Sequence, residues 1–166
     1  MAEIRYSLFV DSALLIDGSL PEEKKSRARE LADKIFGCLS DTFRQDFGRE
    51  GVIMRREIEY AAEALPALSA TTLAGLTPPE GEGKRRCVLL IFHGEDGSVA
   101  EDTVTEILSL LKRNGLWLGR TRVFVFSEED ELVKQINDVC YMGLWGVPRS
   151  ELHESVAEDV SDMIYH

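Results

Sequence analysis

The apolar and polar positions of the chain follow two periods, which predict strands and helices in turn. Every second residue is apolar over residues 4–10, and Val52, Met54, Ile58 and Tyr60 alternate with charged residues, as in strands with one face in water. Between these two stretches, apolar residues recur every three or four positions over 28–43 and predict a long amphipathic helix. Ser19 and Glu22 have the spacing of a capping box, so we expect the helix to begin there.

The second half of the chain contains two runs, residues 87–92 and 123–126, that are apolar at every position. Such runs are typical of central strands that are covered on both faces. Helical periodicity returns after each run and again near the C-terminus. Helices are therefore predicted over 98–114, 127–140 and 152–164, with a turn rich in Gly and Trp over 143–148.

This order of elements predicts a single α/β domain over residues 1–166, a length that suits one domain. A strand, a helix and a second strand form a parallel βαβ unit. Two apolar strands flanked by two strands with one face in water favour a small three-layer sandwich with a four-stranded mixed sheet. The alternative is a ferredoxin-like α+β fold with added C-terminal helices. Residues 61–76 are ambiguous, and the Gly/Pro-rich segment near 77–85 is predicted to be a flexible loop.

Composition argues against several classes of function. The chain has 30 acidic and 19 basic residues and a net charge of −11, which opposes direct binding to nucleic-acid phosphates. Cys38, Cys87 and Cys140 lie far apart and lack zinc-site spacing, which is typical of reduced thiols. Neither a signal peptide nor an apolar run long enough to cross a bilayer is visible. We therefore expect a soluble, acidic, cytoplasmic protein.

Candidate chemistry is expected where strands end, because open α/β sheets bind ligands beyond the carboxyl ends of their strands. Asp11 follows the first predicted strand, and His93, Glu95 and Asp96 follow the third. Carboxylates with one histidine suit Mg²⁺ or Mn²⁺, which would support a metal-dependent, nuclease-like phosphoester hydrolase. The simpler interpretation is that acidic residues favour a helix N-terminus and glycines form the turn. The short segment of Asp11 followed by Ala13-Leu14-Leu15 resembles the opening of PIN-type nucleases, but the other acidic positions of such a site are not placed in this sequence, so no site residue is carried over from that family.

The function that we expect first is a non-enzymatic α/β module that binds a partner protein or a small ligand. The sequence contains neither a GxGxxG nor a GxxxxGK[ST] phosphate loop and no GxSxG elbow, although these absences leave open whether it is an enzyme. Aromatic residues are enriched at protein interfaces, and three follow predicted helices. Trp117, Tyr141 and Trp145 are therefore candidates for a partner or homodimer interface, with plugs over the core as the alternative interpretation.

Overall fold

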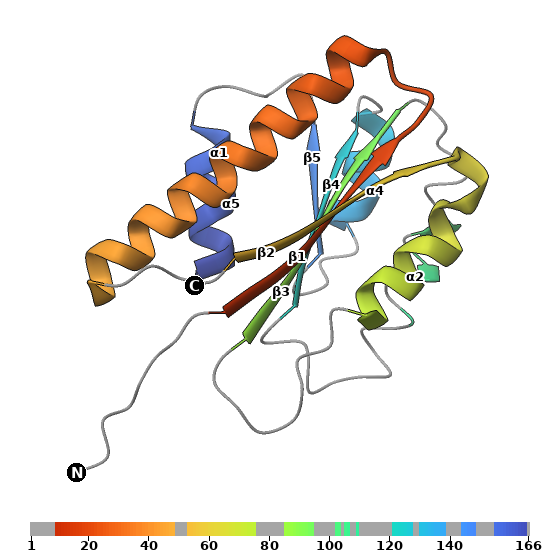
Figure 1. Ribbon diagram of the computed structural model, residues 1–166. Helices are drawn as coiled ribbons and strands as arrows, with labels where there is room; N and C mark the ends of the chain where they lie inside the picture. Colours follow the sequence, from red (N-terminus) through yellow and green to blue (C-terminus); the bar gives the residue numbers. More distant parts are fainter. Residues whose placement is uncertain are drawn as a thin grey trace.

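The computed structural model contains one parallel sheet of five strands in the order β2-β1-β3-β4-β5 (Figure 1). It describes residues 9–48, 53–75, 85–94, 121–127, 130–138, 144–148 and 155–165, with 102, 103, 105, 106 and 109. The strands are β1 (Phe9–Asp17), β2 (Ile53–Tyr60), β3 (Arg85–His93), β4 (Thr121–Ser127) and β5 (Leu144–Pro148).

Helices cover both faces of the sheet, so the predicted three-layer arrangement is confirmed. Figure 1 shows α1 (Glu22–Phe47) and α5 (Val156–Tyr165) on one side of the sheet. The short helix η1 (Ala62–Ala64) and the helices α2 (Leu65–Gly75) and α4 (Asp130–Asp138) lie on the other. The described residues of the predicted helix over 98–114 are helical as well. No helix in the described part of the chain is both long and apolar enough to span a bilayer.

The main core lies between the sheet and the pair α1 and α5. Alternate residues of β1, such as Leu14 and Ile16, and of β3, such as Leu90 and Phe92, point into it together with one face of each helix. Phe92 stacks on Phe126 of β4 with ring centroids 4.5 Å apart. This layer holds the strands in place, and the polar groups that end them are therefore held rigidly.

Two predictions about the sheet are wrong. It has five parallel strands instead of four mixed ones, and the ferredoxin-like alternative is excluded because that sheet is antiparallel. The first strand also lies further along the chain, at Phe9–Asp17, whereas residues 4–8 of the predicted strand are outside the described residues. Residues 13–16 of this strand are buried on both faces of the sheet, and they therefore form a continuous apolar run instead of alternating.

β5 was predicted as a turn because Gly146 and Pro148 are turn-forming residues. Proline is tolerated at the end of an edge strand, where its missing N–H is not needed. Gly146 has no side chain, and a Cβ there would lie 2.9 Å from the backbone oxygen of Val133 in α4. The Asn137 side chain accepts a hydrogen bond from Gly146 N (2.9 Å) and donates one to its carbonyl oxygen (3.1 Å). These contacts hold β5 in a strand conformation although Gly146 and Pro148 have a low strand propensity.

The start of α1 also differs from the prediction. The helix begins at Glu22 after Pro21, and no side chain caps it. The Ser19 hydroxyl donates instead to Asp17 Oδ1, at 2.7 Å, so there is no capping box. The helix ends at Phe47, because Gly48 adopts a left-handed conformation and its N–H donates to the carbonyl of Arg44.

The ambiguous segment after β2 is helical. Pro66 lies in the first turn of α2, where a missing N–H costs nothing. The flexible loop predicted near 77–85 lies outside the described residues except for Arg85, which opens β3.

Candidate functional site

Four polar side chains end four neighbouring strands, and we call them the buried polar row. They are Tyr60 of β2, Asp17 of β1, His93 of β3 and Ser127 of β4. Tyr60 is in register with Asp17, and His93 with Ser127. The register of β1 with β3 continues to the same level, so all four project from one face. Their exposed fractions are 4%, 1%, 0% and 0% in the order given.

The Asp17 carboxylate joins the loops that follow β1 and β3. Its Oδ1 accepts hydrogen bonds from the backbone N–H of Ser19 (2.9 Å) and from the Ser19 hydroxyl (2.7 Å). Its Oδ2 accepts one from the backbone N–H of Gly94 at 3.2 Å. A buried carboxylate is tolerated when such donors satisfy it, and Asp17 therefore fixes both loops relative to each other.

Tyr60 and His93 form the second contact within the row. The Tyr60 hydroxyl lies 3.0 Å from His93 Nδ1 and 3.3 Å from the carbonyl oxygen of Phe92. A ring that carries its proton on Nδ1 satisfies both contacts, because Nδ1–H then donates to the hydroxyl and the hydroxyl donates to Phe92. Nδ1 also lies 3.7 Å from Asp17 Oδ2. The row is thus one connected network and not four separate polar groups.

Ser127 and Gly94 close the other end of the row. The Ser127 hydroxyl donates to the carbonyl oxygen of Gly94 at 3.3 Å. A Cβ at Gly94 would lie 3.1 Å from Asp17 Oδ2, so the carboxylate can approach the Gly94 N–H only because this residue is glycine. The sequence His93-Gly94 therefore serves the packing of the row.

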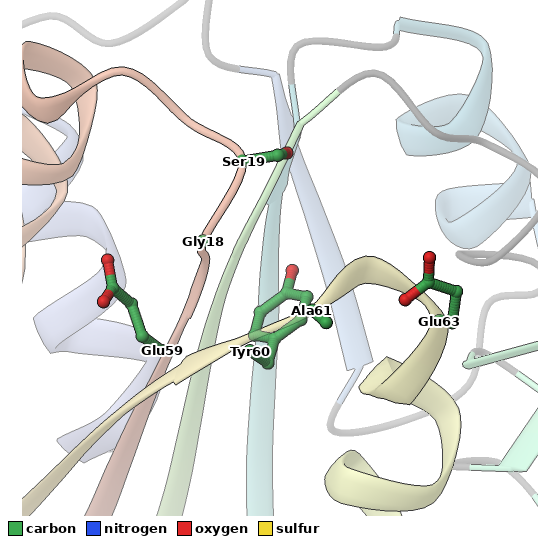
Figure 2. A pocket seen from close by; sticks show the side chains of 6 residues that line it. All are labelled: Gly18, Ser19, Glu59, Tyr60, Ala61 and Glu63. Atoms are coloured by element: carbon green, nitrogen blue, oxygen red, sulfur yellow. The ribbon is translucent and has the colours of Figure 1, made fainter.

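A shallow, open depression of about 460 Å³ lies at the carboxyl ends of β1 and β2 (Figure 2). Tyr60, at one end of the buried polar row, also lines this depression, so the two features touch. Gly18 approaches β2 closely there, since its N–H donates to the Tyr60 carbonyl oxygen at 2.8 Å. The six lining residues are Gly18, Ser19, Glu59, Tyr60, Ala61 and Glu63.

One wall of the depression contains an ion pair. Lys25 of α1 is 7% exposed, and its Nζ lies 2.6 Å from Glu59 Oε1 and 3.4 Å from Glu22 Oε1. The hydrogen bond with Glu59 raises the pKa of Lys25, and the same bond lowers the pKa of Glu59. Glu59 is therefore an anion whose charge is already balanced by a cation of the protein itself.

The predicted metal ligands are only partly placed. Asp11 is the third residue of β1, in register with Cys87, and His93 lies six residues further along β3. At about 3.3 Å per residue the two are about 20 Å apart, so the structure does not bring Asp11 to His93. One carboxylate oxygen of Asp11 is buried and has no hydrogen-bond partner among the described residues. Glu95 and Asp96 are outside the described residues, which hold no metal-like cluster of three or more His, Cys, Asp or Glu side chains.

Of the three predicted interface residues, only Trp145 is described. It lies in β5, half-buried, and stacks on Phe124 with ring centroids 5.0 Å apart. The Arg122 guanidinium lies 5.8 Å from the centre of the Trp145 ring and donates to the Met163 carbonyl in α5. Trp145 thus supports the sheet and α5. Trp117 and Tyr141 lie outside the described part of the chain, and the homodimer stays a prediction.

Asp17 and Tyr60 were not among the predicted site residues. Each ends a strand, and Asp17 is followed by glycine and serine, a usual signal of a loop before a helix. The signal was missed because the first strand was placed too early, which moved its expected carboxyl end to Asp11. Tyr60 was interpreted only as an apolar position of β2.

These features define a doubly wound α/β protein with a polar carboxyl edge and a depression at that edge. The chain order reverses between β1 and β3, where ligands of such sheets usually bind, and the depression lies next to this switch point, at the carboxyl ends of β1 and β2. No known protein-family model matches the sequence, and no curated protein is significantly similar to it. The function must therefore be argued from the site.

Tyr60 is expected to make the folded state less stable at high pH. Burial and the charge of Asp17 raise the pKa of Tyr60 well above its ordinary value of 10. Above pH 10 the unfolded chain releases the phenol proton while the folded protein keeps it, so stability falls as pH rises, by up to about 1.4 kcal/mol per pH unit. In urea unfolding, the stability advantage of the wild type over Tyr60→Phe should be constant from pH 7 to 9 and shrink above pH 10. A difference that stays constant to pH 11.5 would contradict this.

Proposed function

We propose that this protein is a binding module, without chemistry of its own, that takes up a small ligand in the depression at the carboxyl ends of β1 and β2. The observation that carries the proposal is the position of this depression. It lies at the edge where open α/β sheets bind ligands, and its volume of about 460 Å³ is within the range of small-molecule sites, about 300–1,000 Å³.

The distribution of reactive groups favours binding over catalysis. His93 and Ser127, which would be the natural base and nucleophile, are fully buried and belong to a hydrogen-bonded network. The pKa of Tyr60 is raised, so its hydroxyl remains protonated at neutral pH. Ser19, Glu59 and Glu63 line the depression instead, and they offer hydrogen bonds and charge to a ligand.

The buried polar row gives the depression a rigid floor. Tyr60 is held through its hydroxyl, and Ser19 is held through two hydrogen bonds to Asp17. Side chains that are already ordered lose little entropy when a ligand binds, which favours affinity. The buried polar row, which is almost fully excluded from solvent, therefore supports ligand binding from beneath the depression.

Filling the depression should abolish ligand binding. Ala61 is an exposed lining residue, and Ala61→Phe would occupy the space without touching the core. A fragment library titrated into ¹⁵N-labelled protein should shift the amide signals of Gly18, Ser19 and Ala61 in the wild type. In Ala61→Phe we expect an affinity at least about tenfold lower, since about 1.4 kcal/mol of contact is lost.

Ala64→Phe provides the matched control. Ala64 is also exposed and lies three residues further on in η1, but it does not line the depression. This variant should bind fragments as the wild type does. Fragments that bind both variants equally, or a library in which no member shifts the three amides, would contradict the proposal.

A further inference from the structure

The backbone donors at the rim of the depression are already used within the protein. Gly18 N–H donates to the Tyr60 carbonyl at 2.8 Å, and Leu20 N–H donates to the Asp17 carbonyl at 3.2 Å. Ser19 donates both its N–H and its hydroxyl to Asp17 Oδ1. Phosphate sites of α/β proteins depend on free N–H groups in this loop, so the loop has lost what an anion requires.

The charges at the rim also disfavour the binding of an anion. The helix that follows the loop begins with Pro21, which has no N–H, and then with Glu22 and Glu23. The Asp17 carboxylate lies directly below the loop. A phosphate would meet these negative groups, the Lys25 ammonium at this edge is already paired with Glu59, and the net charge of −11 adds to the repulsion.

What the rim offers is acceptors. Figure 2 shows Glu59 and Glu63 on opposite sides of Tyr60, with Ser19 beyond the ring. Lys25 Nζ lies 2.6 Å from Glu59 Oε1, so one carboxylate at this edge already binds an ammonium group of the protein. Glu63 forms no hydrogen bond or ion pair with any other described residue. Every described residue that lines the depression is acidic or uncharged, and the neighbouring Lys25 ammonium is already paired with Glu59.

We infer that the ligand is a small organic cation whose ammonium group is bound by the Glu63 carboxylate, and not a phosphate compound. This inference rests on the proposed function, because it names the ligand class of the same depression. The ammonium group supplies the donors that the rim lacks, and the open Ser19 and Ala61 side of the depression accommodates the rest of the molecule.

Three probes with one skeleton test the class of ligand: benzylamine, benzyl alcohol and benzyl phosphate. Each is titrated into ¹⁵N-labelled wild-type protein at pH 7, and the amides of Gly18, Ser19 and Ala61 are followed. Benzylamine should shift these signals at the lowest concentration, and benzyl phosphate should leave them unchanged. Raising NaCl to 0.5 M should lower the affinity for benzylamine, because salt screens exposed charge pairs.

Two variants test the role of Glu63. Glu63→Gln should lower the affinity for benzylamine about two- to fivefold, the usual effect of one exposed ion pair, and leave benzyl alcohol unaffected. Glu158→Gln is the matched control, since Glu158 is exposed on α5 and the variant has the same net charge. Equal losses in both variants would overturn the inference, because the effect would then come from net charge alone.

The outcomes separate the ligand class from the proposed function. If benzyl phosphate or benzyl alcohol shifts the three amide signals more strongly than benzylamine, the inferred ligand class is wrong, whereas the proposed binding function is still supported. The same holds if none of the three probes binds but other fragments do. If nothing in the fragment library reaches these amides, the proposed function fails together with the inference.

Discussion

Replacing Asp17 by alanine is expected to lower the free energy of unfolding by about 3 kcal/mol. The buried N–H of Gly94 loses its acceptor, and an unsatisfied buried donor costs about 1–3 kcal/mol by itself. The two hydrogen bonds from Ser19 are lost as well, at about 1 kcal/mol or less each, because Ser19 is exposed and water can replace the acceptor. Urea unfolding at pH 7 measures this loss.

Two further variants make the Asp17 result specific. Asp41→Ala removes an exposed carboxylate of α1 and should change stability by no more than about 0.5 kcal/mol. Asp17→Asn keeps one oxygen for Ser19 and turns an amide donor toward the N–H of Gly94. Its loss of stability should therefore lie between those of Asp17→Ala and Asp41→Ala. If Asp17→Ala does not fold, hydrogen exchange at Gly94 in Asp17→Asn still reports the broken contact. A loss in Asp17→Ala no larger than in Asp41→Ala would show that the carboxylate does not join the two loops.

Gly146→Ala is expected to destabilise the protein by about 2 kcal/mol. The added Cβ would lie 2.9 Å from the carbonyl oxygen of Val133 and 3.1 Å from its Cα. Both atoms belong to the backbone of α4, which must move away from β5 to make room. That movement also strains the two hydrogen bonds between Asn137 and Gly146. Thermal or urea unfolding gives the size of the effect.

Gly37→Ala is the matched control for Gly146→Ala. Gly37 lies on the exposed face of α1, and a Cβ there would meet no atom within 4 Å. Alanine favours a helix interior over glycine by up to about 1 kcal/mol, so this variant should be more stable than the wild type. The two substitutions are chemically identical, but they should change the free energy of unfolding in opposite directions. Loss of stability in both would mean that close approach to α4 is not the cause at Gly146.

The elements that were predicted correctly are those whose burial is visible in local periodicity. α1 has apolar residues at helical spacing because one of its faces covers the sheet, and Gly48 ends it. Residues 88–92 of β3 and 123–126 of β4 are apolar at every position because both faces of these strands are buried. β2 alternates over residues 57–60 because it is an edge strand, in which Glu57 and Glu59 are exposed whereas Ile58 and Tyr60 are more buried. Here the local pattern and the tertiary environment agree.

The elements that were missed depend on contacts distant in the sequence. β5 contains Gly146 and Pro148, and it is a strand because β4 pairs with it and Asn137 bonds its backbone. β1 was placed too early because residues 4–10 alternate, whereas the strand includes the continuous run from Ala13 to Ile16. An apolar run predicts burial without saying where pairing begins or ends.

The sequence by itself determined that polar residues end the apolar strands, since His93 and Ser127 follow the two clearest runs. Only the tertiary structure decided which of these ends are neighbours. The order β2-β1-β3-β4 places Asp17 between Tyr60 and His93, and the bounds of β1 leave Asp11 near the amino end of the sheet. The physical reason is that periodicity records how each residue is buried, whereas strand order is set by the packing of whole βαβ units against one another.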